Sequence, residues 1–233
     1  MNDQRSALVT GAGSGIGRAI AISLGQNGYE VLVTGRRLEP LHETANLIKG
    51  AGGQARVAAL DVGDAEAVDE LVAGLVSNSR LEVMVVNAGS FTRAHIADTE
   101  LSDWKRQIDV NLTGAFLCVR AAIHAMRDQE VLNGSRGHIF TINSGAGIRG
   151  FSAGVGYAAS KHGLRGLVES ARPDAANQQI KLTDLIISAT VESEMSAARD
   201  VVKLPADTVA HTVMACLQLS GPANWDRVDL GQI

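Results

Sequence analysis

Short apolar runs alternate along the whole chain with segments whose apolar residues recur at helical spacing. Apolar runs of strand length occur at 7–10, 30–34, 55–60, 83–86, 138–143, 181–187 and, more weakly, 227–230. Between them, a period near 3.6 residues predicts helices that begin near residue 16 and then cover about 38–49, 68–76, 102–128, 156–177 and 205–219. Such alternation predicts a doubly wound parallel sheet of about seven strands with helices on both faces, a three-layer αβα fold. No linker or repeat divides residues 1–233, so we expect one domain.

Composition agrees with this fold and narrows the function. Hydrophobic residues make up 45% of the chain but aromatic residues only 3%, so Ala, Val, Leu and Ile must fill the core, which suits strands covered on both faces. A net charge of -4 gives no strong attraction to nucleic acid or to anionic membranes. We find no signal peptide and no apolar stretch of spanning length, and therefore expect a soluble cytoplasmic protein. Cys118 and Cys216 lie far apart in apolar surroundings, which favours buried reduced thiols.

A glycine-rich loop follows the first predicted strand and opens the first helix. It reads T-G-A-G-S-G-I-G from Thr10 to Gly17. Glycines let the backbone turn sharply and let a pyrophosphate approach closely, and the helix N-terminus offers free N–H groups and a positive dipole end. This context predicts a dinucleotide site; the alternative is a turn without a ligand. The residues expected at the phosphates are Gly11, Ser14, Gly15, Ile16 and Gly17.

The spacing of this loop, T-G-x-x-x-G-x-G, resembles the cofactor loop of the short-chain dehydrogenase/reductase family. Later motifs extend the resemblance over nearly the whole chain. It implies a Rossmann-like fold, an oxidoreductase activity, and a homodimer or homotetramer. Within the family, the chain is similar to 3-oxoacyl-[acyl-carrier-protein] reductase-like members and to reductases of small hydroxy acids and carbonyl compounds.

The end of the second predicted strand indicates the cofactor. In a doubly wound fold this point lies beside the adenine ribose, where an acidic residue holds the 2′-hydroxyl of NAD. Here the strand ends Val33-Thr34-Gly35-Arg36-Arg37 without an acid. Arginine can pair with a 2′-phosphate through forked, charge-assisted hydrogen bonds. We therefore expect NADP(H) rather than NAD(H), with Arg36 as the first candidate and Arg37 as the second; surface arginines without a ligand are the alternative.

The resemblance supplies further expected cofactor contacts. Asp61 and Val62 close the third strand, where the family's aspartate faces the adenine amino group. The turn after the fourth strand, made of Asn87, Ala88 and Gly89, lies against the adenosine half of the cofactor in the family.

Four residues match the family's catalytic set in order and spacing. Tyr157 and Lys161 lie four residues apart on a predicted helix, so they share one face. Ser144 ends the fifth strand at the edge where such sheets hold ligands, and Asn111 lies upstream in an Asn-Leu-Thr-Gly segment. The set implies that a hydride passes through the cofactor while Tyr157 moves a proton.

The chemistry explains these residue types. A free tyrosine has a pKa near 10, and a nearby ammonium together with an oxidised nicotinamide lowers it. Lys161 is expected to provide that ammonium and to bond the nicotinamide ribose, and Ser144 to hold the substrate oxygen. Asn111 is expected to fix a water that links Lys161 to solvent. Each residue also has an ordinary structural alternative.

Two segments depart from the family pattern. Ser188-Ala189 replaces the usual proline–glycine pair before the loop that clasps the nicotinamide, although Val191 and Ser193 match in kind and are expected to contact the carboxamide. Pro173 falls late in the Tyr157 helix, which should kink or end near Ala171. The family's substrate lid is short here, so an open substrate site is a hypothesis.

No metal is expected, because the histidines are scattered and none has ligand spacing with a supporting carboxylate or thiol. The substrate is expected to be a small carbonyl compound or alcohol, and the C-terminal segment 228–233 resembles reductases of small hydroxy acids and ketones. A dinucleotide-binding regulator with lapsed catalysis is the alternative function.

Overall fold

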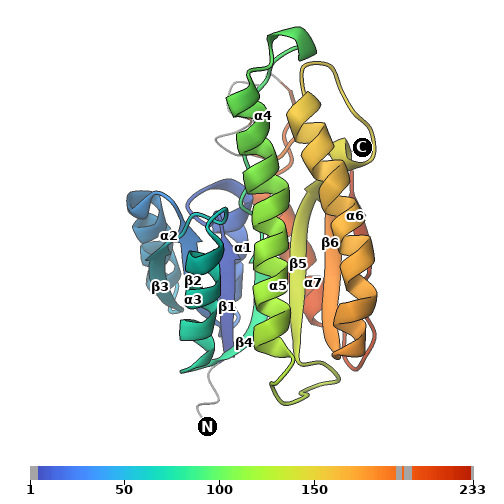
Figure 1. Cartoon of the computed structure of the whole chain (residues 1–233). Coiled ribbons are helices and arrows are strands. Elements are labelled where there is room, and N and C mark those ends of the chain that lie inside the picture. Colours follow the sequence, from blue (N-terminus) through green and yellow to red (C-terminus); the bar gives the residue numbers. More distant parts are fainter. Residues whose placement is uncertain (1–4, 193–195, 197–200, 232–233) are drawn as a thin grey trace.

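The seven strands form one parallel sheet in the order β3-β2-β1-β4-β5-β6-β7 (Figure 1). The structure is a computed structural model and describes residues 5–192, 196 and 201–231. The strands are β1 Arg5–Thr10, β2 Glu30–Gly35, β3 Gln54–Ala59, β4 Arg80–Val86, β5 Gly137–Ser144, β6 Ile180–Ile187 and β7 Arg227–Leu230. The α-helices are α1 Gly15–Gln26, α2 Leu38–Gly50, α3 Ala65–Val76, α4 Leu101–Ile108, α5 Gly114–Met126, α6 Val155–Asn177 and α7 Ala206–Leu217.

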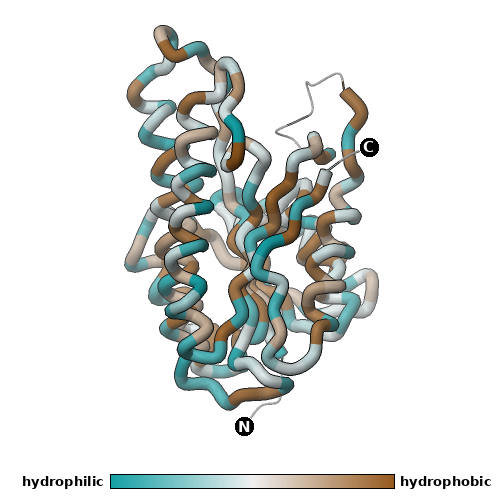
Figure 2. Tube along the Cα trace, turned by 90° about the vertical axis from the view of Figure 1, so that its right-hand side faces the viewer, coloured by the Kyte–Doolittle hydropathy of each residue, from teal (hydrophilic) through white to brown (hydrophobic). Residues whose placement is uncertain are grey.

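Helices cover both faces of the sheet, which confirms the three-layer α/β fold. One apolar core packs α1, α2 and α7 against one face, with Ile20, Ile48 and Val213 among its fully buried members. A second core packs α3, α5 and α6 against the other face. Figure 2 shows apolar residues running along the strands in the middle of the molecule. Strands buried on both faces explain why their sequences are nearly continuous apolar runs.

The strand order places a crevice above the carboxyl ends of β1 and β4. From β1 the chain builds outward through β2 and β3, and then returns to the other side of β1 at β4. The loops that follow β1 and β4 therefore diverge, and a doubly wound sheet binds its ligands at this switch point.

The helical region predicted over 102–128 is confirmed as one continuous run, in which α4 passes through a five-residue π-helical turn at Asp109–Thr113 into α5. The continuous helical run Leu101–Met126 is, by length and composition alone, apolar enough to cross a membrane, contrary to the sequence-based expectation. Its apolar side chains, however, pack into the core, where Leu117, Cys118 and Val119 are buried. Core helices commonly meet the same criterion.

Pro173 does not end α6, which was one of the two expected outcomes. The helix continues to Asn177, and Ala175 in its last turn is fully buried. Arg172 in the same turn donates to the carbonyl oxygens of Leu182 and Asp226, at 3.3 and 2.7 Å. The Arg172 hydrogen bonds before Pro173 and the buried Ala175 after it therefore hold both sides of the proline against the rest of the fold.

Candidate active site

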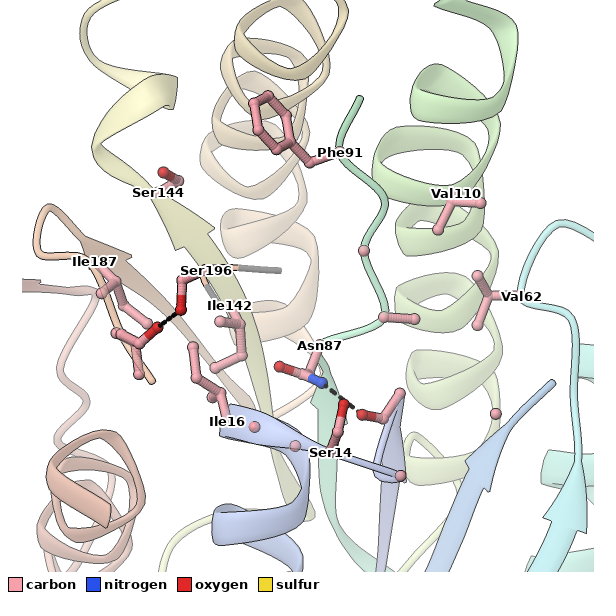
Figure 3. Close-up of a pocket in the computed structure, with 18 of the residues that line it drawn as sticks. Ser14, Ile16, Val62, Asn87, Phe91, Val110, Ile142, Ser144, Ile187 and Ser196 are labelled. Carbon is pink, nitrogen blue, oxygen red and sulfur yellow. Dashed lines mark hydrogen bonds between the residues drawn. The ribbon is translucent and has the colours of Figure 1, made fainter. Parts of the chain in front are cut away.

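A cavity of about 410 Å³ opens at the carboxyl ends of the strands. Its lining brings together most of the residues singled out in the sequence (Figure 3). They are Gly11, Ser14, Gly15, Ile16, Gly17, Arg36, Arg37, Asp61, Val62, Asn87, Ala88, Gly89, Ser144, Tyr157, Lys161 and Val191. Its size is within the range of small-molecule and cofactor sites.

The glycine loop packs so closely against neighbouring atoms that side chains at two of its positions would clash. Gly11 has φ +65°, a conformation that favours glycine. A Cβ on Gly17 would lie 2.4 Å from both the Asn87 Nδ2 atom and the Gly11 carbonyl oxygen. Asn87 Nδ2 in turn donates to the carbonyl oxygens of Thr10 and Gly11, at 2.9 and 3.2 Å. The turn after β4 thus braces the loop after β1.

The first turn of α1 faces the cavity with its backbone N–H groups available. Its N-cap residue, Ser14, is extended and makes no side-chain capping hydrogen bond, and the first turn carries no acidic residue. An uncapped helix N-terminus beside a glycine loop binds anions well, because the N–H groups and the helix dipole both favour negative charge. The arrangement fits a pyrophosphate.

The charged side chains at this end of the cavity come from the β2 and β3 ends. Arg36 and Arg37 are exposed and line the cavity directly after β2. Asp61, after β3, accepts a hydrogen bond from the Gly63 N–H at 3.0 Å. Val62 beside it is buried. A cationic pair next to one carboxylate can receive a phosphorylated ribose on one side and an amino group on the other.

Tyr157 and Lys161 lie one turn apart on α6 and face Ser144 at the end of β5. The Lys161 Nζ atom lies 5.8 Å from the centre of the Tyr157 ring and donates to the Ile142 carbonyl oxygen at 2.8 Å. The Ser144 Oγ atom accepts from the Ala146 N–H at 3.2 Å, which fixes its position at the strand end. Because β1 and β4 lie between β2 and β5 in the sheet, these groups line the cavity on the other side of the switch point from Arg36.

Burial governs the protonation of these groups. It raises the pKa of Tyr157, and a hydrogen bond with the Ser144 side chain opposes the rise. Burial also lowers the pKa of Lys161 to about 8, against the opposing charge of Asp184. Tyr157 therefore holds its proton at neutral pH in this protein, whereas Lys161 carries its charge up to about pH 8.

Asn111 lies behind the cavity rather than in its lining. In the π-helical turn, its Nδ2 atom donates to the Ser90 carbonyl oxygen at 2.8 Å and to the Ser160 Oγ atom at 3.0 Å. Its Oδ1 atom accepts from the Ser90 N–H at 2.7 Å. The side chain thereby ties the loop after β4 to α6, and its expected role towards a water stays a prediction.

The cavity lining also contains Phe91, which the sequence did not point to. The Phe91 ring centre lies 5.2 Å from that of Tyr157 in an edge-on arrangement. Figure 3 shows it above the strand ends on the same side as Ser144. Its position two residues after Gly89 was an available signal. Ser193 lies outside the described residues.

Within the described ranges 5–192, 196 and 201–231, no group of three or more His, Cys, Asp or Glu side chains is placed to hold a metal ion. His138 is buried beside Thr183, and His162 bonds the Ala158 carbonyl oxygen of its own helix. Both cysteines are buried and unpaired.

Comparison with known proteins extends these observations. The family model for short chain dehydrogenase matches residues 5–201. The chain belongs to the short-chain dehydrogenase family. It is therefore an oxidoreductase of this family, with the family's α/β fold.

Three known proteins illustrate the similarity. A 3beta-hydroxysteroid dehydrogenase of Mediterraneibacter gnavus is 36% identical over 180 residues, which is 76% of this chain but only 63% of that protein. An uncharacterized oxidoreductase of Staphylococcus aureus is 30% identical and is aligned over 95% of this chain and 94% of its own length. A metagenomic short-chain oxidoreductase, solved in complex with NADP, is 29% identical, covers 99% of this chain and 98% of its own, and has a TM-score of 0.84.

Proposed function

We propose that the protein is an NADP(H)-dependent oxidoreductase that interconverts a ketone and a secondary alcohol. One observation carries the proposal: a single cavity has a glycine loop with two arginines at one end and Ser144, Tyr157 and Lys161 at the other. Bound NADP(H) would supply or accept the hydride. Family structures that hold NADP or NADPH support this cofactor, with NAD(H) as the alternative.

The cavity provides fitting positions for the parts of the cofactor. Gly11 and Gly17 leave the space that a pyrophosphate needs, and the uncapped N-terminus of α1 supplies N–H donors. Arg36 and Arg37 would hold the 2′-phosphate, because a guanidinium pairs with phosphate through two parallel hydrogen bonds. Val191 would lie at the carboxamide end, where it is buried in the cavity wall.

The chain's own groups then handle the proton. Tyr157 holds its proton because burial raises its pKa, so it can donate that proton to the oxygen of a carbonyl being reduced. Ser144, hydrogen-bonded to Tyr157, would hold the same oxygen and stabilise its growing negative charge. The Lys161 ammonium would favour the tyrosinate once the proton has left.

The substrate end of the cavity favours a neutral, apolar compound. Phe91 packs edge-on against Tyr157, and its ring centre lies 6.0 Å from that of Phe151. Among the described lining residues, Lys161 is the one charged side chain at this end. Among these described residues a carboxylate substrate would find no cation besides Lys161, whereas a ketone with an apolar or aryl substituent can pack on the aromatic rings. The relative named as a hydroxysteroid dehydrogenase supports an apolar alcohol.

The test is a pair of measurements on the purified protein. NADPH and NADH are titrated by fluorescence, and the preferred cofactor is then assayed with a panel of neutral ketones and 2-oxo acids. The Tyr157→Phe variant should lose turnover yet keep NADPH affinity within about two-fold, because the phenyl ring keeps the packing and only the proton is lost. Tyr29→Phe is the matched control, since Tyr29 bonds Arg5 and Glu82 away from the cavity. Substantial activity in Tyr157→Phe would refute the proton-transfer role.

The competing function is a dinucleotide-binding regulator with lapsed catalysis. The assembled Ser144, Tyr157 and Lys161 favour an enzyme, because a regulator needs no proton donor at the end of its cofactor cavity. A protein that binds NADPH tightly but turns over no member of a broad carbonyl and alcohol panel would favour the regulator.

A further inference from the structure

A buried carboxylate lies directly behind the catalytic end of the cavity. Asp184 is the acidic residue of β6, a strand whose eight residues are all buried, and it is 3% exposed. Its Oδ1 atom accepts from the Thr141 hydroxyl at 2.7 Å, and its Oδ2 atom accepts from Asn143 Nδ2 at 3.0 Å. Both donors are on β5, where Thr141 is the register partner of Asp184.

The hydrogen bonds continue from Asp184 to the catalytic serine. Asn143 uses its other side-chain atom, Oδ1, to accept the backbone N–H of Ser144 at 2.8 Å. The residue on the other side of Asn143, Ile142, supplies the carbonyl oxygen that binds Lys161. Asp184 thus anchors the end of β5, residues 142–144, through Asn143. This strand end contains Ser144 and supplies the carbonyl oxygen that binds Lys161.

A carboxylate is a costly choice for this place. No lysine or arginine of the described chain lies within ion-pair distance of Asp184, and burial raises its pKa. A buried charge without a direct ion-pair partner destabilises the fold, whereas a neutral amide could keep both contacts by accepting from Asn143 Nδ2 and donating to the Thr141 hydroxyl. Costly buried groups of this kind gather at functional sites.

The charges that act on this carboxylate come from two neighbouring elements. Lys161 and Arg172 reach it from α6, and both oppose the rise of its pKa. On β7, the pKa of Arg227 is raised mainly by its hydrogen bonds with Asp229. The charge of Asp184 makes a smaller contribution to the same rise. Of these cations, Lys161 is the buried one, and Asp184 is the group that opposes the fall of its pKa.

We propose that Asp184 is a positioning residue for catalysis: through Asn143 it holds the strand end that carries Ser144 and the Lys161 acceptor, and it is the counter-charge of the buried Lys161 ammonium. The inference rests on the proposed function for its catalytic meaning. Asp184 then has two separable roles. An amide side chain can take over the hydrogen bonds, but it cannot supply the negative charge.

The experiment compares Asp184→Asn and Asn143→Ala with the wild type. Both the kcat/KM of ketone reduction and the NADPH affinity, followed by fluorescence, are measured against pH. In the wild type both should decline above about pH 8, as Lys161 loses its proton. Asp184→Asn keeps the shape but removes the charge, so both declines should move to lower pH by roughly half a unit or more. Asn143→Ala keeps the charge, so its decline should stay in place while kcat falls on the order of 10-fold through misplaced Ser144.

Thr183→Val is the matched control. Thr183 is a fully buried polar residue on the same strand, but it bonds His138 and Asn224 rather than the site. It should lower stability without moving either pH profile. Coincident profiles for Asp184→Asn and the wild type would overturn the charge role, and wild-type kcat in Asn143→Ala would overturn the positioning role. Should Asp184→Asn fail to fold, Asp184→Ser removes the same charge in a smaller side chain and its pH profiles decide the charge role, while Asn143→Ala decides the positioning role.

The binding profile keeps this inference separate from the proposed function. A wild type that binds NADPH but reduces no ketone would contradict the proposed function, and the shift of the binding profile in Asp184→Asn would still be measurable. Active wild-type protein with unmoved profiles in both variants would contradict the inference alone.

Discussion

Replacing Gly17 by alanine tests the packing of the cofactor loop most directly. Gly17 lies in the first turn of α1, and an added Cβ would lie 2.4 Å from Asn87 Nδ2 and 2.4 Å from the Gly11 carbonyl oxygen. Neither atom is the free end of a flexible side chain. One belongs to the backbone, and the other is anchored to the Thr10 and Gly11 carbonyl oxygens.

The magnitude follows from two opposing effects. Forcing a methyl group into this contact should cost about 1–3 kcal/mol, because the loop or Asn87 must move. Removing glycine from a helix returns roughly 0.5–1 kcal/mol. We therefore expect Gly17→Ala to lower the free energy of unfolding by roughly 1 kcal/mol, within a range of about 0–2.5 kcal/mol, which for a chain of this size lowers the Tm by roughly 2–4 °C per kcal/mol. The displaced loop should also weaken NADPH binding on the order of 10-fold or more.

Gly166→Ala is the matched control. Gly166 is an exposed residue within α6, and a Cβ there would meet no atom within 4 Å. This variant should gain about 0.5–1 kcal/mol from helix propensity and leave NADPH affinity unchanged.

Urea unfolding and NADPH fluorescence titration on both variants provide the assay. If Gly17→Ala is as stable as Gly166→Ala and binds NADPH like the wild type, the reasoning about the loop is wrong.

Three further predictions concern separate parts of the molecule. Arg36→Ala should weaken NADPH binding on the order of 10- to 100-fold and leave NADH affinity nearly unchanged. Arg37→Ala should show a smaller loss of NADPH affinity. Equal use of NADH and NADPH by the wild type would contradict this prediction. Phe91→Ala should lower kcat/KM for aryl ketones more than for acetone in steady-state assays, and equal losses would exclude the aromatic wall. Burial, helped by Lys181, lowers the pKa of His138 to about 3, so between about pH 6.5 and 3 the unfolded chain binds a proton that the folded chain does not. In that range His138 should lower the free energy of unfolding by about 1.4 kcal/mol for each pH unit of acidification. Urea unfolding at several pH values should show a smaller dependence of this free energy on pH in His138→Gln, but not in the exposed control His211→Gln.

The fold was largely predictable because its pattern is local. Each strand buried on both faces appears as a short apolar run, and each covering helix shows one apolar face. The pattern was less informative where several elements meet at one segment. The helical region expected over 102–128 is present, but its periodicity did not predict the π-helical turn at Asn111, which bonds Ser90 and Ser160 from two other elements. An end of α6 near Pro173 was one expected outcome, yet the helix continues to Asn177, as its periodicity predicted.

The candidate site divides in the same way. The glycine loop, Arg36 and the Tyr157–Lys161 pair could be proposed from spacing, because turn chemistry and helical periodicity act over a few residues. Phe91 lies in a loop, and the packing of distant segments brings its ring to Tyr157.

By itself, the sequence determined the alternation of strands and helices, the cofactor loop and the residue types of the proton-transfer group. Only the tertiary structure decided which groups control that chemistry. Asp184 is one of three polar residues in the otherwise apolar strand β6, and no local pattern assigns it a partner. The pairing of β5 with β6 sets it beside Thr141 and Asn143, and so behind Ser144 and Lys161. The physical reason is that strand register and burial are collective properties of the sheet, and they set both the hydrogen bonds and the pKa values of the site.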